Sequence, residues 1–152
     1  MKYRKHIRLS PELYTEPGWY FITLVSRRKQ NLFTGQIKVL LEDVLKDIPK
    51  IFSGWEIDSF IIMPNHLHFI LSATDCSCRA CPCSLGRVVG AYKSLVYKRL
   101  RQEMGMKESP WQLNYYEHIV RSEKELDKIR LYIKANPFKE AIDWKEMDSY
   151  MI

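Results

Sequence analysis

The sequence contains no apolar run that approaches the length of a membrane span. Residues 1–6 are largely basic, but the apolar stretch of a signal peptide does not follow them. The chain also has no internal repeat, no low-complexity tract and no linker long enough to separate two domains. Since 152 residues suffice for one domain with its own core, we expect a single domain over residues 1–152, which stays in the cytoplasm and has no membrane partner.

Cysteine is absent from all but one short stretch of the chain. That stretch, residues 76–83, has the spacing Cys-x-Cys-x-x-Cys-x-Cys and contains Cys76, Cys78, Cys81 and Cys83. Disulfides are rare in cytoplasmic proteins, whereas four thiolates can hold one zinc ion in a closed tetrahedral site. Structural zinc sites usually take pairs of ligands from separated segments, so a metal-free loop is the alternative. The sequence leaves both interpretations open.

Acidic residues are outnumbered, with 18 against 24 basic residues, a net charge of +6 and a pI near 9.1. Basic residues cluster near the amino terminus, at residues 27–29 and along residues 93–101, with tyrosine and tryptophan nearby. Cations neutralise phosphates and aromatic rings stack on bases, so this pattern favours a nucleic-acid partner, although any one cluster can be an ordinary solvated face. The predicted DNA contacts are Arg27, Arg28, Lys93, Lys98, Arg99 and Arg101.

The apolar pattern predicts an α+β domain. The predicted strands cover residues 19–25, 55–63, 66–72 and 115–120, and the predicted helices cover residues 36–52, 85–101 and a segment that opens at Ser122 and closes at Pro137. Pro64-Asn65 supplies the turn of a β-hairpin. The order strand, helix, strand, strand, helix, strand is that of the ferredoxin-like βαββαβ fold, an antiparallel sheet under two helices, here with one helix appended at the carboxyl end.

Two histidines alternate with apolar residues in the second strand of the hairpin. Side chains of a strand alternate between its faces, so His66 and His68 point to one side while Leu67 and Phe69 point to the other. Imidazole is the commonest nitrogen ligand of divalent ions, and the pair is therefore a candidate metal site. Two hydrogen-bonded or exposed histidines would produce the same pattern.

A tyrosine and an asparagine lie four residues apart in the last helix. Tyr132 and Asn136 therefore share a helix face, while Ile129 and Ile133 lie on a neighbouring stripe toward the core. A phenol, with a pKa of about 10, becomes a useful nucleophile when a metal polarises its target, and an amide oxygen is a hard metal ligand. The alternative is a half-buried tyrosine and an asparagine that ends the helix before Pro137.

In this combination the sequence resembles the HUH family of single-tyrosine transposases, and within it the REP-associated tyrosine transposases. The name HUH stands for His, hydrophobic residue, His, which is matched by residues 66–68. The resemblance extends to residues 90–95, 111–112 and 116–121, and to Tyr132-Ile133 followed by Asn136-Pro137. It covers nearly the whole chain, from about Gly18 to Pro137, and the ordered set is far more specific than any single member.

The resemblance implies a role for each matching residue. His66 and His68 would bind a catalytic Mg²⁺ or Mn²⁺, and Asn136 would complete its protein ligands. Tyr132 would attack the scissile phosphate, form a 5′-phosphotyrosine and release a 3′-hydroxyl. Rejoining is the reverse reaction, so no nucleotide cofactor is needed. The implied substrate is single-stranded DNA that carries a hairpin, from mobile or repetitive elements.

Tyr115 and Tyr116 are competing candidates for the nucleophile, because they precede His118 in a predicted strand. Alternation allows only one of them to face the metal, and Tyr116 shares a face with His118. We interpret Tyr116 and His118 as sheet residues that support the site, with His118 a partner of a metal ligand or a DNA contact.

Two other functions also fit the positive charge: a catalytically silent protein that binds a DNA hairpin, and an RNA-binding ferredoxin-like domain. A protein that only binds DNA has no need for the set His66, His68, Tyr132 and Asn136. The RNA-binding alternative lacks the aromatic stacking signature of an RNA-recognition motif in the first strand and the hairpin. The sequence leaves open whether the protein is a monomer or a homodimer, and whether the tyrosine acts in cis or in trans.

Overall fold

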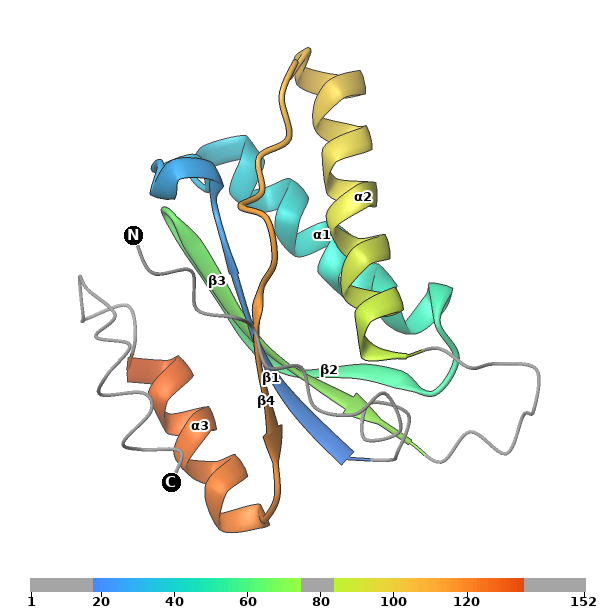
Figure 1. The fold of residues 1–152 in the computed structure, drawn as a ribbon, viewed down its shortest axis with the longest axis vertical. Helices are drawn as coiled ribbons and strands as arrows, with labels where there is room; N and C mark the ends of the chain where they lie inside the picture. The colour runs from blue at the N-terminus through green and yellow to red at the C-terminus, as the bar shows by residue number, and fades with distance from the viewer. Residues whose placement is uncertain (1–17, 75–83, 136–152) are drawn as a thin grey trace.

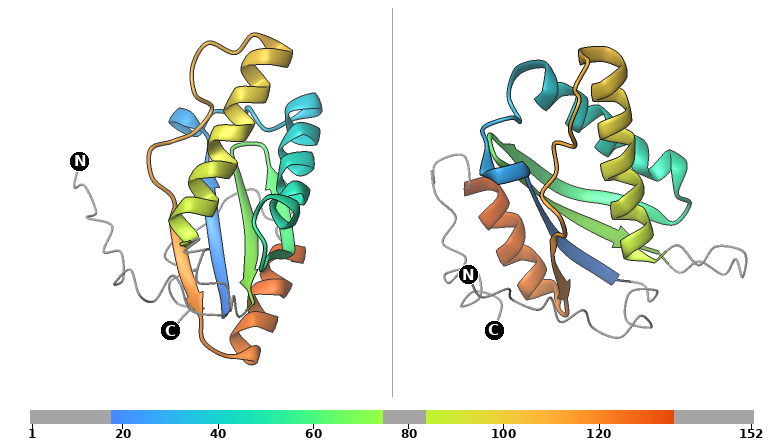
Figure 2. Two further views of the ribbon diagram at one scale, coloured as in Figure 1. Left: turned by 90° about the vertical axis from the view of Figure 1, so that its right-hand side faces the viewer. Right: turned by 45° about the horizontal axis from the view of Figure 1, so that its top comes forward.

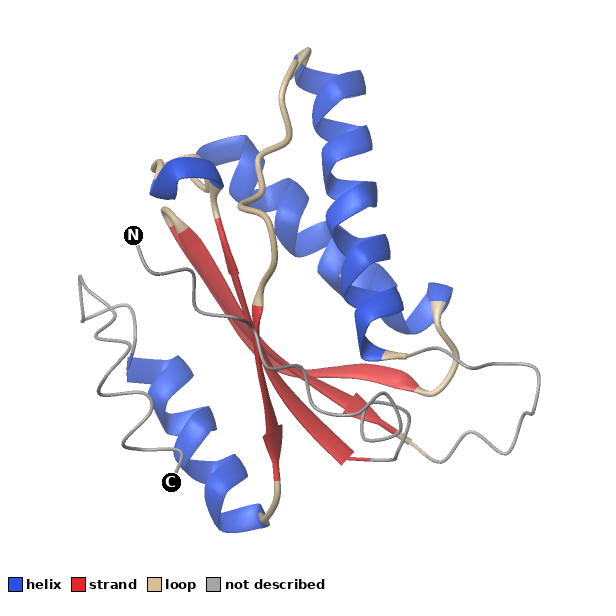
Figure 3. Cartoon of the chain, viewed as in Figure 1, coloured by secondary structure: helices blue, strands red, loops and turns tan. Residues whose placement is uncertain are grey.

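The computed structural model describes residues 18–74 and 84–135. Its elements follow the predicted order, with only small shifts of the boundaries (Figures 1 and 3). The strands are β1 (Gly18–Val25), β2 (Trp55–Met63), β3 (His66–Ala73) and β4 (Tyr116–Val120). The helices are α1 (Gly35–Ile51), α2 (Leu85–Met104) and α3 (Glu123–Ala135), with a short 3-10 helix η2 (Arg27–Lys29) after β1. The cysteine cluster lies outside the described residues, so neither interpretation of it is tested.

The four strands form one sheet in the order β2-β3-β1-β4, and every neighbouring pair is antiparallel. The hairpin β2-β3 turns at Pro64-Asn65, as its turn chemistry predicts. After β1 the chain passes through α1 and enters the sheet again as β2, which is separated from β1 by β3. This is the split βαβ arrangement. The predicted ferredoxin-like architecture with an appended helix is confirmed.

The two faces of the sheet carry separate apolar cores. Helices α1 and α2 cover one face, and α3 covers the other (Figures 1 and 2). Leu41 and Leu45 of α1 and Val96 of α2 belong to the larger core, together with Leu67 and Phe69 of β3. Burial of each such side chain contributes about 1.5–3 kcal/mol to folding. None of the helices within the described residues is long and apolar enough to cross a membrane.

The smaller core holds α3 on the opposite face of the sheet. Leu126, Ile129 and Ile133 of α3 are buried there against Phe21 of β1 and Ile70 of β3. The helix begins after Ser122, whose side-chain oxygen accepts a hydrogen bond from Glu125 N at 3.1 Å. This packing brings the carboxyl half of α3 over the face of β3 on which the two histidines lie.

Candidate active site

The histidine pair lies on the face of β3 that α3 covers. His66 and His68 are paired with Val25 and Thr23 of β1, in register with the buried Phe21–Ile70 pair on the same face. Both imidazoles are buried, with 7% and 0% of their surface exposed, and their ring centroids are 5.0 Å apart. The alternation predicted for residues 66–69 is therefore observed, because Leu67 and Phe69 point into the core on the other face.

Asn65 determines which nitrogen of His66 is protonated. The Nδ1 atom of His66 lies 2.6 Å from Asn65 Oδ1. An amide oxygen only accepts hydrogen bonds, so His66 Nδ1 donates and the lone pair is on Nε2. That Nε2 atom is buried and has no hydrogen-bond partner within residues 18–74 and 84–135. A buried imidazole nitrogen whose lone pair accepts no hydrogen bond is well suited to bind a metal ion.

Thr23 and Phe21 fix the orientation of His68. Thr23 Oγ1 lies 2.7 Å from His68 Nδ1 in a fully buried hydrogen bond between neighbouring strands. Phe21 stacks on the imidazole at a centroid distance of 5.3 Å and an interplanar angle of 23°. A histidine held through Nδ1 presents Nε2 in a defined direction, as metal-binding histidines do. Sequence inspection missed Thr23, because its place opposite His68 depends on strand register.

Burial keeps both histidines neutral at neutral pH. It lowers the pKa of His66 to about 4. The pKa of His68 is lowered well below its ordinary value of 6.5, first by burial and then by the neighbouring His66. Neutral imidazole is the form that binds metal ions, so the pair fits a divalent ion. The predicted third ligand, Asn136, lies outside the described residues, and the described residues alone hold no cluster of three or more His, Cys, Asp or Glu side chains suited to a metal.

Tyr132 of α3 lies against His68, one member of the histidine pair. Its ring centroid is 5.6 Å from that of His68, at an angle of 67°. The ring also meets Phe21 edge-on at 6.4 Å. Ile129 and Ile133 occupy the neighbouring buried stripe of the helix, as the spacing predicts. The tertiary fold therefore brings together a phenol and two neutral imidazoles that are more than sixty residues apart in the sequence.

The two competing tyrosines point to opposite faces of the sheet. Tyr115 packs against the core under α1 and α2, with its hydroxyl beside Gly86. Tyr116 is paired with Thr23, so it shares the face of the histidines, but it lies two strands away from His68 and is 38% exposed. Only one of the two faces the site, as alternation requires.

The predicted DNA contacts on α2 differ in their surroundings. Lys93 Nζ donates hydrogen bonds to Gln112 O at 3.1 Å and Asn114 O at 3.5 Å, and burial lowers its pKa. Arg99 forms an ion pair with Glu103. Lys98 is exposed, and the exposed Arg101 lies over the Tyr97 ring at 4.9 Å. Lys93 therefore supports the loop before β4, whereas Lys98 and Arg101 are accessible to a polyanion.

The remaining predicted DNA contacts lie in η2, next to the histidine hairpin. Ser26 N donates to Asn65 O at 2.9 Å, which joins the start of η2 to the residue before His66. Arg27 forms an ion pair with Glu108 at 2.5 Å, and Arg28 is exposed. Arg28 and Lys29 adopt left-handed backbone conformations, with φ of 55° and 54°. Such conformations are strained in residues other than glycine and occur often at functional sites.

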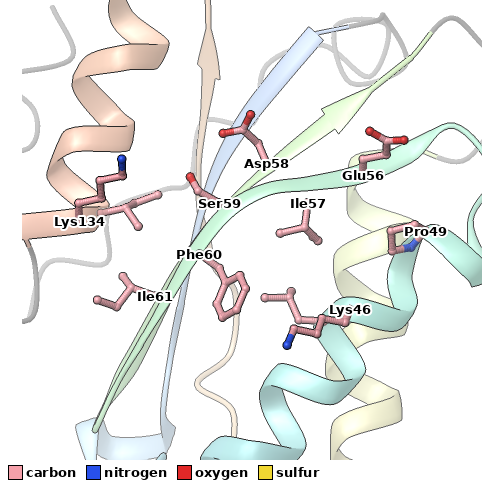
Figure 4. Close-up of a pocket in the computed structure, with 11 residues that line it drawn as sticks. Lys46, Pro49, Glu56, Ile57, Asp58, Ser59, Phe60, Ile61 and Lys134 are labelled. Atoms are coloured by element: carbon pink, nitrogen blue, oxygen red, sulfur yellow. The ribbon is translucent and has the colours of Figure 1, made fainter.

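A cavity of about 760 Å³ lies elsewhere, along the outer edge of β2 (Figure 4). Its walls come from α1, β2 and α3 and include Pro49, Asp58 and Ile133. Neither histidine nor Tyr132 lines it. The chemistry of the histidine pair, rather than the size of a cavity, therefore locates the candidate active site.

Residues 16–136 match the family described as transposase IS200 like. The chain is also 33% identical over 174 aligned positions to an uncharacterized protein of Haemophilus influenzae, an alignment that covers 98% of this chain and 94% of that protein.

Two solved structures share the fold. One is described as a REP-associated tyrosine transposase bound to a REP hairpin, with a TM-score of 0.63, 23% identity and coverage of 84% of this chain and 71% of that one. The other is described as a putative transposase from Deinococcus radiodurans, with a TM-score of 0.53, 20% identity and coverage of 80% and 92%. At these identities the likeness establishes a common fold.

Proposed function

Because this chain belongs to the IS200-like transposase family, we propose that it cleaves and rejoins single-stranded DNA through a covalent bond to Tyr132. The observation that carries this proposal is the contact between the rings of Tyr132 and His68, whose centroids are 5.6 Å apart. A helix-borne phenol beside two neutral imidazoles combines a nucleophile with ligands for the ion that activates its target.

His66 and His68 would hold a divalent ion through their Nε2 atoms, and Asn136 would add an amide oxygen. Mg²⁺ or Mn²⁺ bound there supplies a positive charge that polarises the scissile phosphate. Asn65 and Thr23 keep the two imidazoles oriented, and the apolar contacts of α3 limit the access of water to the buried rings.

Tyr132 would form a phosphotyrosine by attacking phosphorus. The phenol oxygen forms a bond to phosphorus and gives up its proton, while the bond between phosphorus and the 3′-oxygen breaks. The released 3′-oxygen takes up one proton and becomes a 3′-hydroxyl, so the number of bound protons is unchanged. In the reverse reaction a 3′-hydroxyl attacks the phosphotyrosine and releases Tyr132. One phosphate ester replaces another, so the reaction requires no nucleotide cofactor.

The proposed substrate is a DNA hairpin with a single-stranded flank. One structural neighbour is described as bound to a REP hairpin, which supports this substrate class. The described residues form one sheet with its helices and contain no separate element for opening a duplex. Opening a duplex costs about 1.4 kcal/mol per base-pair step in lost stacking. The hairpin stem offers regularly spaced phosphates to exposed cations such as Lys98 and Arg101, while the flank enters the site.

The test is the covalent adduct on a denaturing gel, with Mn²⁺ and an end-labelled hairpin. We expect wild-type protein to form the adduct when the flank is open and to lose it when the flank is annealed to a complement. Tyr132→Phe should abolish the adduct and retain binding, because it removes only the nucleophilic oxygen. Tyr116→Phe, which alters the other tyrosine on this face, should still form it.

Three results would count against the proposal. An adduct with Tyr132→Phe would move the nucleophile to another tyrosine. Equal cleavage of open and annealed flanks would contradict the single-strand requirement. Tight binding of the hairpin by the wild-type protein without any adduct would favour a DNA-binding protein that lacks activity.

A further inference from the structure

Helix α3 contacts both edges of the sheet through polar pairs. The edge strands are β2 and β4, since the strand order is β2-β3-β1-β4. Arg130 of α3 binds Asp58 of β2, and Glu125 of α3 binds His118 of β4. The two pairs therefore lie at opposite edges, with the apolar stripe of α3 and Tyr132 between them. Neither pair takes part in the chemistry proposed above.

An irregularity in β2 accompanies the Asp58/Arg130 pair. The register of β2 and β3 shifts between Ile57 and Ser59, so that Asp58 is the extra residue of a β-bulge. Bulges redirect side chains, and here the carboxylate meets α3. Arg130 Nε donates to Asp58 Oδ2 at 2.8 Å and Arg130 Nη2 donates to Asp58 Oδ1 at 2.5 Å. Two parallel hydrogen bonds define the rotation of the helix as well as its distance from the sheet.

The pair at the other edge joins the first turn of α3 to β4. His118 lies opposite Phe21, so its side chain is on the α3 face, where Nε2 contacts Glu125 Oε1. Glu125 Oε2 accepts a second hydrogen bond from Arg121 N at 2.8 Å. The carboxylate thus ties the first turn of the helix to both the side chain and the backbone at the end of β4. The strand pattern of the sequence points to His118 but not to Glu125, because their contact depends on the packing of α3.

We propose that Asp58/Arg130 and His118/Glu125 are positioning pairs, which hold α3 at the orientation that places Tyr132 over the histidine pair. This inference rests on the proposed role of Tyr132. Apolar contacts alone resist separation of α3 from the sheet, but they tolerate small sliding and rotation because they lack direction. Attack on phosphorus is sensitive to such changes, since a misplacement of about 1 Å can cost about 100-fold in rate.

The first experiment measures adduct formation at saturating DNA with variants of the β2 edge. Arg130→Lys keeps the charge and loses the bidentate geometry, and Asp58→Asn loses the charge. Asp127→Asn is the matched control, because Asp127 accepts a hydrogen bond from the same Arg130 at 3.1 Å but belongs to α3 itself rather than to the sheet. We expect both edge variants to lower the rate constant about tenfold or more, with unchanged affinity for the hairpin, and the control to match wild type.

The second experiment applies the same measurement to the β4 edge. Glu125→Gln weakens the contact with His118, whereas Glu123→Gln removes an exposed acid from the same first turn and so controls for the helix dipole. We expect Glu125→Gln alone to slow the reaction. Rate constants equal to those of the matched controls at both edges, or a loss confined to hairpin affinity, would overturn the inference.

A third measurement does not depend on catalysis. Amide hydrogen exchange should become faster in α3 of Asp58→Asn than in α3 of Asp127→Asn, while α2 exchanges equally in both. Equal exchange in α3 of these two variants would also overturn the inference, and it can be measured in variants that are too unstable for the rate assay. If wild-type protein forms no adduct at all, the proposed function fails, and faster exchange in α3 would then still establish that the pair holds the helix.

Discussion

Both histidines are held by a hydrogen bond to Nδ1, which bears on the metal binding proposed for them. Thr23 holds His68 through Nδ1 at 2.7 Å, and Asn65 holds His66 in the same way at 2.6 Å. These partners would not touch a bound ion, but they fix the tautomer or the orientation of the two imidazoles proposed as its ligands.

We expect Thr23→Val, which removes the hydroxyl and keeps the shape, to weaken Mn²⁺ binding about 10- to 100-fold. Thr74→Val is the matched control, because the Thr74 hydroxyl bonds Gly54 O beyond the other end of β3. Titration calorimetry with Mn²⁺ measures both affinities. Equal affinities for the two variants would show that Thr23 has no part in the proposed metal site.

Burial of the same histidines makes the fold sensitive to acid. The pKa of His66 is lowered to about 4 and that of His68 well below 6.5. In the unfolded chain both histidines take up protons at an ordinary pKa of about 6.5. Between these values the unfolded state binds more protons than the folded state, so the free energy of unfolding falls as the pH drops from about 6.5 toward 4.

Urea unfolding without metal, at about pH 7.5, 5.5 and 4.5, tests this dependence. A His66→Gln/His68→Gln double variant should lose less stability over the same interval, because it lacks these two imidazoles. If the free energy of unfolding falls equally with pH in both proteins, other side chains cause the acid sensitivity.

At the scale of elements, α2 presents basic residues with two different roles. The ammonium group of Lys93 bonds two backbone carbonyls of the loop before β4, whereas Lys98 is exposed to solvent. Charge along the helix therefore does not by itself identify DNA contacts. Of these two predicted DNA contacts, only Lys98 is exposed enough to reach a phosphate.

We expect Lys98→Ala to weaken hairpin binding and to reduce the slope of log affinity against log salt by about 1, because one phosphate contact is lost. Lys93→Met should instead lower the free energy of unfolding by about 1 kcal/mol and leave that slope unchanged. Fluorescence anisotropy at several salt concentrations and thermal unfolding measure the two effects. A reduced slope for Lys93→Met would place that ammonium group on the DNA.

At the scale of the whole molecule, Tyr132 lies over the histidine pair of its own chain. The apolar stripe of α3 and the polar pairs at both sheet edges hold it there. One chain therefore brings the proposed nucleophile together with the two histidines proposed as metal ligands.

A mixture of Tyr132→Phe and His68→Ala should consequently form no adduct, because neither chain contains both a nucleophile and an intact histidine pair. Each variant mixed with wild-type protein serves as the control, and should show the adduct of the wild-type chain. Recovery of activity in the mixture of the two variants would show that α3 exchanges between chains.

The order of the elements and the strand hairpin follow from the sequence alone, and the sequence also points to His66, His68 and Tyr132 as candidate site residues. Hydrophobic periodicity depends on local geometry, so the apolar pattern identifies the helices and strands and shows that the two histidines share a face. The family, too, is recognisable from the order of short motifs, and the match over residues 16–136 confirms it.

The tertiary structure decided which groups meet across that framework. The pairing of Thr23 with His68 depends on the register of β1 and β3, and the pairing of Asp58 with Arg130 depends on a bulge in an edge strand. The hydrogen bonds of Lys93 to Gln112 O and Asn114 O depend on the path of a loop without regular structure. Contacts of this kind join residues far apart in the chain, and no local pattern encodes them because they arise from the packing of several elements at once.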